Sequence, residues 1–290
     1  MDAQGTVGGV IGDIIQAGYK NMAHREGDRV GEDGLLICGV CGTRKEHLLT
    51  WFDGRTIKVP CMCLCDQKAE YLAEQARMEE ERRSRVNRLL DSSMMDVKYR
   101  DAKMEKFVET EDNEKIRVIC NRYINLFDDF YRDNQGLLFW GDVGTGKSFA
   151  AACIANELIE KGTSVLMTSF SRILSIIRQG ADEEKNILNQ ISQNRLVIFD
   201  DFGAERSTEY AMEKIFDIID QRYRAKKPMI ITTNLKFSEM KSEEDMRYRR
   251  LYDRIFEVCF PVEFKTTRSW RKEQANEKYV RTKRLLTDEG

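Results

Sequence analysis

One stretch of the chain has the residue types and the spacing that hold a nucleoside triphosphate. The sequence "GDVGTGKS" runs from Gly141 to Ser148 and fills the pattern G-x-x-x-x-G-K-[ST]. In this pattern the glycines let backbone N–H groups curl around the phosphates, Lys147 reaches the β- and γ-phosphates, and Ser148 ligates Mg²⁺. The predicted phosphate-binding residues are Gly141, Asp142, Val143, Gly144, Thr145, Gly146, Lys147 and Ser148.

Acidic and amide side chains further along the chain could complete a hydrolytic site. In "LVIFDDFG" two acids end an apolar run, as in a Walker B motif. Asp200 would then hold Mg²⁺ through water, and Asp201 would orient or deprotonate the attacking water. Asn234 ends the apolar run "PMIITTN" and could position the same water. Acid pairs also cap helices, and asparagine often ends strands, but the order of the three motifs favours hydrolysis.

Five of the eight cysteines lie between positions 38 and 65, well before the phosphate loop. Cys38 and Cys41, followed by Gly42, have the spacing of a zinc knuckle. A hairpin turning at "DG" (53–54) would lead to a second ligand pair. Unrelated thiols and a redox switch are the alternatives, and His47 is a weaker candidate ligand. The spacing predicts a structural Zn²⁺ site whose remaining two ligands come from Cys61, Cys63 and Cys65.

Short apolar runs alternate with longer helical stretches from about residue 96 onward. The runs are "GLLFW" (136–140), "SVLMTS" (164–169), "LVIFD" (196–200), "PMIITTN" (228–234) and "CFPVEF" (259–264). Continuous apolar runs are typical of strands buried on both faces, so we expect an α/β fold with a parallel five-stranded sheet flanked by helices. Three further cysteines lie in apolar patterns and are predicted to be core thiols: Cys120, Cys153 and Cys259.

The composition bounds the remaining possibilities. Of 290 residues, 33% are charged, and the net charge of −2 excludes a globally basic nucleic-acid coat but leaves room for a basic patch. The stretch 265–284 is such a patch or a solvated helix. No apolar run approaches the roughly 20 residues of a membrane span, and the N-terminus lacks a basic leader. We therefore expect a cytoplasmic protein without membrane contact.

Four regions follow from these patterns. Residues 1–34 are a weakly patterned N-terminal segment, and 35–66 form the zinc-binding module. Residues 67–95 are rich in charge and free of proline and glycine, which is typical of a solvated helical arm. Residues 96–290 form the phosphate-binding α/β domain.

The motifs "GDVGTGKS", "IFDDFGAE", "IITTN" and "YDRIFE" together resemble the AAA+ ATPases of the DnaC/DnaI helicase-loader group. The likeness is strongest to forms from phages and prophages of Gram-positive bacteria, and it covers about 96–290. The stretches "DGLLICGVCG" and "CMCLCDQK" also resemble the zinc module of that group, which favours Cys63 and Cys65 over Cys61 as ligands.

The resemblance implies ATP, Mg²⁺ and Zn²⁺ as cofactors and an ATPase that loads a replicative DnaB-type helicase. It also implies contact with single-stranded DNA and self-assembly into a ring or spiral, hexameric on the helicase. Arg254 matches the arginine finger that reaches a neighbour's site, and Arg250 lies one turn earlier. Arg271 stands where the group carries its sensor 2 arginine, with Arg268 as the alternative.

In the family geometry, Phe170, Arg172 and Tyr210 would lie near the ring axis and contact a single strand. Two other functions remain open. One is an IstB-like ATPase that regulates DNA transposition, which is not expected to carry the cysteine module. The other is a zinc-bearing adaptor that uses ATP only as a structural switch.

Overall fold

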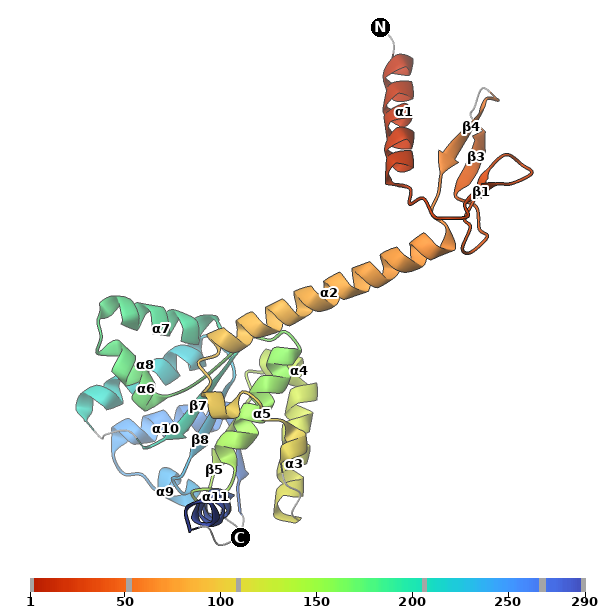
Figure 1. Cartoon of the computed structure of the whole chain (residues 1–290). Helices are drawn as coiled ribbons and strands as arrows, with labels where there is room; N and C mark the ends of the chain where they lie inside the picture. Colours follow the sequence, from red (N-terminus) through yellow and green to blue (C-terminus); the bar gives the residue numbers. More distant parts are fainter. Residues whose placement is uncertain (1–2, 51–53, 108–110, 205–207, 266–269, 288–290) are drawn as a thin grey trace. The chain divides into compact units, whose positions relative to one another are not determined.

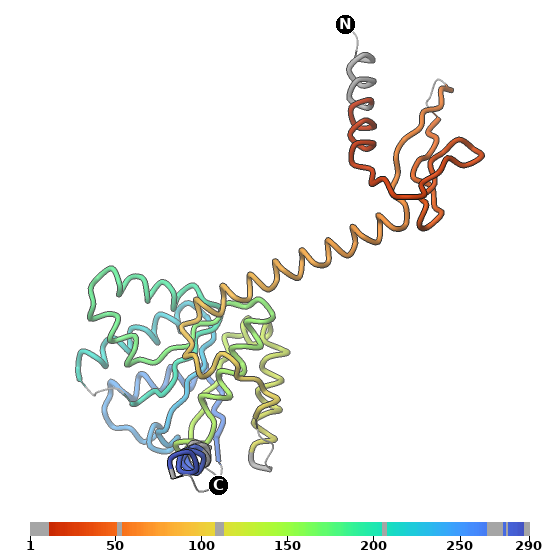
Figure 2. The backbone as a smooth tube through the Cα atoms, viewed as in Figure 1, coloured from red at the N-terminus to blue at the C-terminus, as the bar shows by residue number. Residues whose placement is uncertain are grey.

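A computed structural model of the chain describes residues 3–50, 54–107, 111–204, 208–265 and 270–287 (Figure 1). The chain divides into two compact units, Met1–Arg83 and Ser84–Gly290. Figure 2 traces the backbone of each unit. The boundary between the units falls inside one long helix, α2 (Leu64–Ser92).

The N-terminal unit has one helix and two small antiparallel sheets before α2 begins. These elements are α1 (Ala3–Asn21), β1 (Arg29–Val30), β2 (Leu36–Ile37), β3 (Glu46–Thr50) and β4 (Thr56–Pro60). Strand β1 pairs with β2, and β3 pairs with β4. Between β3 and β4, Gly54 has a φ of +84°, a conformation that favours glycine. Asp53, the other residue of the predicted turn, lies outside the described residues.

The first 34 residues contain more regular structure than their pattern predicts, because α1 and β1 both lie there. Helix α1 packs against β4, and a Cβ at Gly18 would come within 2.6 Å of the Pro60 ring. The Tyr19 hydroxyl also donates a hydrogen bond of 2.9 Å to Glu46. Tertiary contacts such as these stabilise a helix that has weak local propensity.

Helix α2 lies where a charged arm is predicted over residues 67–95, and it begins and ends three residues earlier. It extends over 29 residues, and none of its side chains is buried. Arg77 and Arg82 form ion pairs with glutamates three residues earlier, Glu74 and Glu79. Such exposed pairs contribute only a few tenths of a kcal/mol each, so the helix depends on its good helix formers.

The C-terminal unit is built on one parallel five-stranded sheet, in the order β6-β7-β8-β5-β9. The strands are β5 (Gly136–Trp140), β6 (Val165–Ser169), β7 (Leu196–Phe202), β8 (Met229–Thr233) and β9 (Cys259–Glu263). All five predicted strands are confirmed. Four of them are buried along most of their length, as their continuous apolar runs predict.

Helices cover both faces of this sheet (Figure 1). The described helices of this unit are α3 (Glu111–Asn125), α4 (Phe127–Arg132), α5 (Lys147–Glu160), α6 (Phe170–Ile177), α7 (Ala181–Gln193), α8 (Glu209–Arg224), α9 (Phe237–Lys241), α10 (Met246–Val258) and α11 (Trp270–Thr287). Short 3-10 helices at Val97–Tyr99 and Met104–Lys106 precede α3. Among the described residues, no helix is both long enough and apolar enough to span a membrane.

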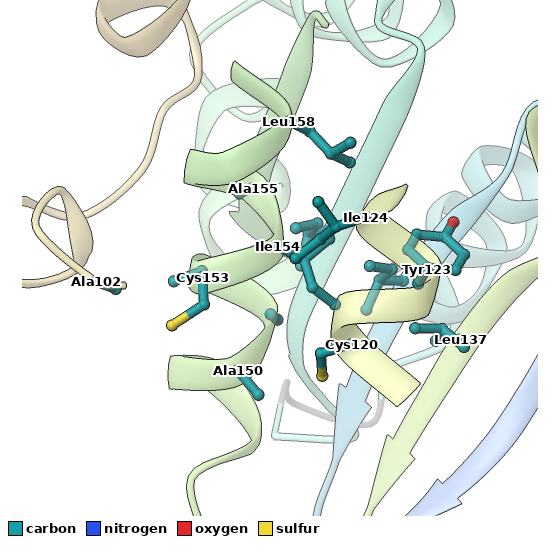
Figure 3. Close-up of a cluster of buried hydrophobic side chains, with 14 of the residues drawn as sticks. Ala102, Cys120, Tyr123, Ile124, Leu137, Ala150, Cys153, Ile154, Ala155 and Leu158 are labelled. Atoms are coloured by element: carbon teal, nitrogen blue, oxygen red, sulfur yellow. The ribbon is translucent and has the colours of Figure 1, made fainter. Parts of the chain in front are cut away.

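Two apolar cores lie on the two faces of the sheet. One joins α3 and α5 to the sheet, with Ile124 of α3 near Ile154 and Leu158 of α5 (Figure 3). The other joins α6, α7, α8 and α10 to the opposite face. Alternation along β5 supplies both cores, since Leu137 belongs to the first and Leu138 to the second. The cores fix the strand ends, and therefore the loops that carry the predicted site.

The three predicted core thiols are confirmed. Cys120, Cys153 and Cys259 are at most 2% exposed. Burial raises the pKa of Cys120 to about 12 and raises the pKa of the other two thiols as well. A thiol that stays protonated is a poor nucleophile, so these residues serve packing.

Candidate nucleotide and metal sites

The predicted phosphate loop connects β5 to α5 and has the backbone conformation that its glycines permit. Gly141, Gly144 and Gly146 have φ angles of 136°, 84° and 95°, which side chains other than glycine's rarely allow. A Cβ at Gly141 would lie 2.4 Å from the carbonyl oxygen of Phe264. The loop can therefore turn its backbone N–H groups inward at the N-terminus of α5, where the helix dipole favours an anion.

Lys147, the first residue of α5, is held inside this loop. Its side chain is 5% exposed, and its Nζ donates hydrogen bonds of 2.7 Å to the carbonyl oxygens of Gly141 and Asp142. The ammonium group therefore sits within the ring of backbone that would surround the phosphates. Phosphate oxygens can take the place of these carbonyl oxygens as its partners.

The acid pair at the end of β7 is joined to the phosphate loop by hydroxyl groups. The Thr232 hydroxyl donates a hydrogen bond of 2.6 Å to Oδ1 of Asp200. It also accepts one of 2.9 Å from the backbone N–H of Asp201. Burial raises the pKa of the Asp200 carboxyl, while hydrogen bonds from Thr232 and Ser148 oppose that shift. The two predicted magnesium ligands, Ser148 and Asp200, thus lie together.

Asp201 and Asn234 lie at the carboxyl ends of neighbouring strands. Asp201 is exposed and has a φ of 55°, next to an irregularity in the pairing of β7 with β8. A positive φ is strained for an aspartate and is often kept at sites that need one side-chain direction. Asn234 directly follows β8 and is also exposed. The sequence patterns did not predict a role for Thr232, which bonds to both acids. The two threonines before Asn234 are the signal in the sequence that could have indicated it.

Arg254 has its described contacts on α8 rather than at the phosphate loop. Its Nε lies 2.8 Å from Oδ1 of Asp220, and its guanidinium carbon lies 4.3 Å from the centre of the Phe216 ring. Arg250, one turn earlier on α10, is exposed. Within one chain, therefore, the described contacts do not join Arg254 to Lys147.

The remaining predicted arginines and DNA-contacting residues divide into three groups. Arg271 lies in α11, but its side chain, like all of Arg268, lies outside the described residues. Phe170 is 1% exposed and stacks on a buried ring of β7, so its predicted contact with a DNA strand is wrong. Arg172 is half exposed and donates to the Met94 carbonyl oxygen, and Tyr210 is exposed.

Four of the five clustered cysteines come together in the N-terminal unit. Their sulfur atoms all lie within 4.8 Å of one another, and they belong to Cys38, Cys41, Cys63 and Cys65. The first pair lies in the turn between β2 and β3, where Gly42 has a φ of 69° and donates a hydrogen bond to the Cys38 carbonyl oxygen. The second pair lies at the start of α2.

The other two candidate ligands lie outside this group. The Cys61 backbone N–H continues the hairpin by bonding to the Lys45 carbonyl oxygen, and its thiol faces the Arg44 carbonyl oxygen at 3.5 Å. His47 is exposed on β3.

The surroundings of the cysteine cluster favour thiolates at some positions and oppose them at others. The hydroxyl and backbone N–H of Thr43 lower the pKa of Cys41 to about 5. Burial raises the pKa of Cys63 to about 12, and its thiol donates to Asp66 at 3.1 Å. Four converging sulfurs match the tetrahedral site that Zn²⁺ prefers.

Comparison with known proteins identifies the family. The family described as IstB-like ATP binding protein matches residues 66–278. The chain belongs to this family. The matched region begins directly after Cys65 and ends at residue 278, so the family likeness covers most of α2 and of the C-terminal unit but not the cysteine cluster.

Several relatives are named as replicative helicase loaders. The replicative helicase loader DnaC of Escherichia coli strain K12 is 29% identical over 180 residues, which cover 60% of this chain and 72% of that protein. DnaC of Buchnera aphidicola subsp. Baizongia pistaciae is 25% identical over 182 residues, 61% of this chain and 73% of that protein. The resemblance to the helicase-loader group is therefore confirmed.

A crystal structure of the DnaC helicase loader shares the fold. It superposes with a TM-score of 0.51 at 22% identity and covers 59% of this chain and 100% of that one. With the parallel sheet and the family assignment, this confirms the expected AAA+ P-loop fold. The chain is an ATPase of the IstB-like ATP binding family.

Proposed function

We propose that the chain is an ATP-dependent loader that delivers a hexameric replicative helicase to single-stranded DNA. The observation that carries the proposal is the joined site: Ser148 of the phosphate loop and the Thr232–Asp200 pair of the sheet meet at one point. A protein that used ATP only as a passive switch would not need the water-handling residues Asp201 and Asn234. The relatives named as replicative helicase loaders support helicase loading as the process that ATP hydrolysis drives.

The chain's own residues divide the work on ATP. Lys147 would bind the β- and γ-phosphates from inside the loop, and Ser148 and Asp200 would hold Mg²⁺. Bound Mg²⁺ would supply charge that offsets the negative charge on the phosphate oxygens. Asp201 then orients the attacking water, and its positive φ keeps the carboxylate at the exposed end of β7. Asn234 fixes the same water from the end of the neighbouring strand.

Hydrolysis further requires a second subunit. Arg254 contacts α8 of its own chain and not its own phosphate loop, so it is suited to act on a neighbour's nucleotide. A cation supplied in this way accelerates hydrolysis by about 10³–10⁵ in other nucleotide hydrolases. The ATPase is therefore active in a ring or spiral rather than as a single chain, and Arg271 adds a sensor 2 contact.

The cysteine cluster holds one structural Zn²⁺ in this proposal. The four sulfurs are close enough for tetrahedral ligation and leave no open position for catalysis. Among the described residues of the N-terminal unit, Leu35 is the one large aliphatic side chain that is buried. So small an apolar core cannot stabilise the unit by itself, and metal binding must contribute much of its folding energy. We assign this unit to contact with the helicase, and the exposed basic face of α11 to single-stranded DNA.

An IstB-like regulator of DNA transposition is the second candidate, because the matching family bears that name. The two functions differ in their partner. A helicase loader forms a complex with a DnaB-type hexamer, and a transposition regulator responds instead to a transposase.

Complex formation tests the choice between them. The full chain is mixed with ATP and a purified DnaB-type helicase, and the mass of the product is measured by size-exclusion chromatography with light scattering. We expect a complex with the wild-type chain and with Cys61→Ser, and a loss of complex with Cys63→Ser, which removes a zinc ligand. A wild-type chain that binds none of several DnaB-type helicases but is stimulated by a transposase would reverse the assignment.

A further inference from the structure

The carboxylate of Asp220 on α8 forms ion pairs with two arginines, and each arginine uses its Nε atom. The Nε of Arg254 lies 2.8 Å from Oδ1 of Asp220, and the Nε of Arg224 lies 2.7 Å from Oδ2. The Asp220 side chain is 15% exposed and that of Arg254 is 25% exposed. We propose that Asp220 is a positioning residue that orients the guanidinium of Arg254 toward the nucleotide of a neighbouring subunit. This inference rests on the proposed role of Arg254 in hydrolysis.

The atoms used in these contacts matter for the proposal. The contact at Nε is an ion pair without hydrogen-bond geometry, since Oδ1 of Asp220 has no hydrogen-bond partner among the described residues, and it draws the guanidinium toward α8 by charge without using the pair of terminal nitrogens. Those terminal nitrogens form the fork that binds two phosphate oxygens at once. Asp220 therefore fits a residue that aims Arg254, rather than one that competes with phosphate for it. Arg224 lies at the other carboxylate oxygen, but its side chain is 75% exposed, so this pair adds little restraint to Asp220.

An aromatic ring restrains the guanidinium from a second side. The guanidinium carbon of Arg254 lies 4.3 Å from the centre of the Phe216 ring, a cation–π distance. A free arginine side chain has many rotamers, and ordering them only when the subunits meet would slow the reaction. Asp220 and Phe216 together favour one rotamer of Arg254 before the subunits assemble.

A separate contact ties the same two helices together and provides a control. The Tyr223 hydroxyl of α8 donates hydrogen bonds of 2.8 Å to the carboxylate of Glu257 on α10. This contact joins α8 to α10 through the Tyr223 hydroxyl, whereas Arg254 meets the same residue only at its ring, whose centre lies 6.0 Å from the guanidinium carbon. Glu257→Gln weakens it and leaves Asp220 intact.

The test measures ATP hydrolysis by the full chain in a double-mutant cycle. Asp220→Asn should lower kcat by about tenfold, because a misplaced catalytic group loses rate steeply, and should leave KM for ATP unchanged. Arg254→Ala should lower kcat by about 10³-fold. Asp220→Asn should have no further effect once Arg254 is alanine, since it acts only through that side chain. Glu257→Gln should keep the wild-type kcat.

A second measurement does not depend on turnover. ADP with aluminium fluoride mimics the transferred phosphate, and an arginine from the neighbour should tighten subunit assembly around it. In sedimentation velocity, Asp220→Asn should assemble only at higher protein concentration than the wild type and Glu257→Gln. If Asp220→Asn does not fold, Phe216→Leu tests the same restraint, with a smaller loss of kcat in the same direction.

The possible outcomes distinguish a failure of the positioning role of Asp220 from a failure of the proposed role of Arg254 in hydrolysis. If Asp220→Asn lowers kcat equally with and without the arginine, Asp220 is structural, and the inference fails while the role of Arg254 stands. If Asp220→Asn hydrolyses and assembles like the wild type, the inference also fails alone. If Arg254→Ala hydrolyses ATP at the wild-type rate, the proposed action between subunits fails together with it.

Discussion

Replacing Thr232 with valine tests whether its hydroxyl holds the acid pair in place. Thr232 is fully buried on β8, donates to the Asp200 carboxylate at 2.6 Å, and accepts from the Asp201 N–H at 2.9 Å. Valine has nearly the same shape, so the packing of the sheet stays and only the two hydrogen bonds disappear. We expect Thr232→Val to fold, to be less stable, and to hydrolyse ATP more slowly.

The expected loss of stability can be worked from these two bonds. A hydrogen bond to a charged group contributes about 1.5–3 kcal/mol, and leaving a buried N–H without a partner costs about 1–3 kcal/mol. Partial relaxation of the exposed Asp201 reduces the second value, so we expect a loss of about 2–4 kcal/mol in the free energy of unfolding. Thr232→Ser keeps the hydroxyl and should lose much less.

Thr168→Val is the matched control. Thr168 is buried on β6, and among the described residues its hydroxyl has no hydrogen-bond partner. The same chemical change there removes an unpaired polar group, so stability should stay the same or rise slightly. Urea unfolding of the full chain, followed by circular dichroism, compares the two variants. Equal stability of Thr232→Val and Thr168→Val would refute the reasoning.

The pH dependence gives the same prediction a second check. Burial raises the pKa of Asp200, and the hydrogen bond from Thr232 opposes that shift. Thr232→Val therefore raises this pKa further, and the folded variant keeps its proton to higher pH than the unfolded chain does. Because the unfolded chain titrates alike in both proteins, the deficit in stability relative to the wild type should grow as the pH rises from the folded wild-type pKa of Asp200 to that of the variant, and shrink in acid.

Three further predictions concern separate parts of the chain. Lys147→Ala should abolish ATP binding measured by calorimetry, whereas Asp201→Asn should bind normally and lose hydrolysis, and a wild-type rate for Asp201→Asn would remove it from the site. Metal analysis should find one Zn²⁺ per chain in the wild type and in Cys61→Ser, and none in Cys63→Ser; equal zinc in both variants would contradict the ligand set. Arg222 is fully buried and donates to four backbone carbonyl oxygens, so Arg222→Met should cost about 3–5 kcal/mol in thermal unfolding, and an unchanged melting temperature would contradict this.

The sheet and the phosphate loop could be predicted because their signals are local. Strands buried on both faces need continuous apolar runs, and the loop needs glycine where φ is positive, as at Gly146. Thr232 could not be assigned in this way. Its role depends on the pairing of β8 with β7, which brings its hydroxyl to Asp200, and a threonine in an apolar strand has no distinctive pattern of its own.

Non-local packing also explains the remaining differences. Helix α1 depends on its contact with β4, and Phe170 begins α6 with its ring turned into the core against Phe199. For the zinc site, spacing alone left three cysteines for two positions. In the structure Cys61 still belongs to the backbone ladder of the hairpin, while Cys63 and Cys65 lie at the start of α2 with their sulfurs beside those of Cys38 and Cys41, and this supports the proposed ligand set.

Loading onto a closed circle tests the central claim most directly. A hexameric ring cannot thread onto circular single-stranded DNA, so a helicase can unwind an oligonucleotide annealed to the circle only after a loader has placed it there. With a DnaB-type helicase and ATP, we predict unwinding with the wild-type chain, none with Lys147→Ala or Arg254→Ala alone, and partial recovery when the two variants are mixed. Recovery is expected because a mixed interface can pair an intact phosphate loop with an intact Arg254. Unwinding that is equally fast without the chain, or that Lys147→Ala supports fully, would contradict an ATP-dependent loader.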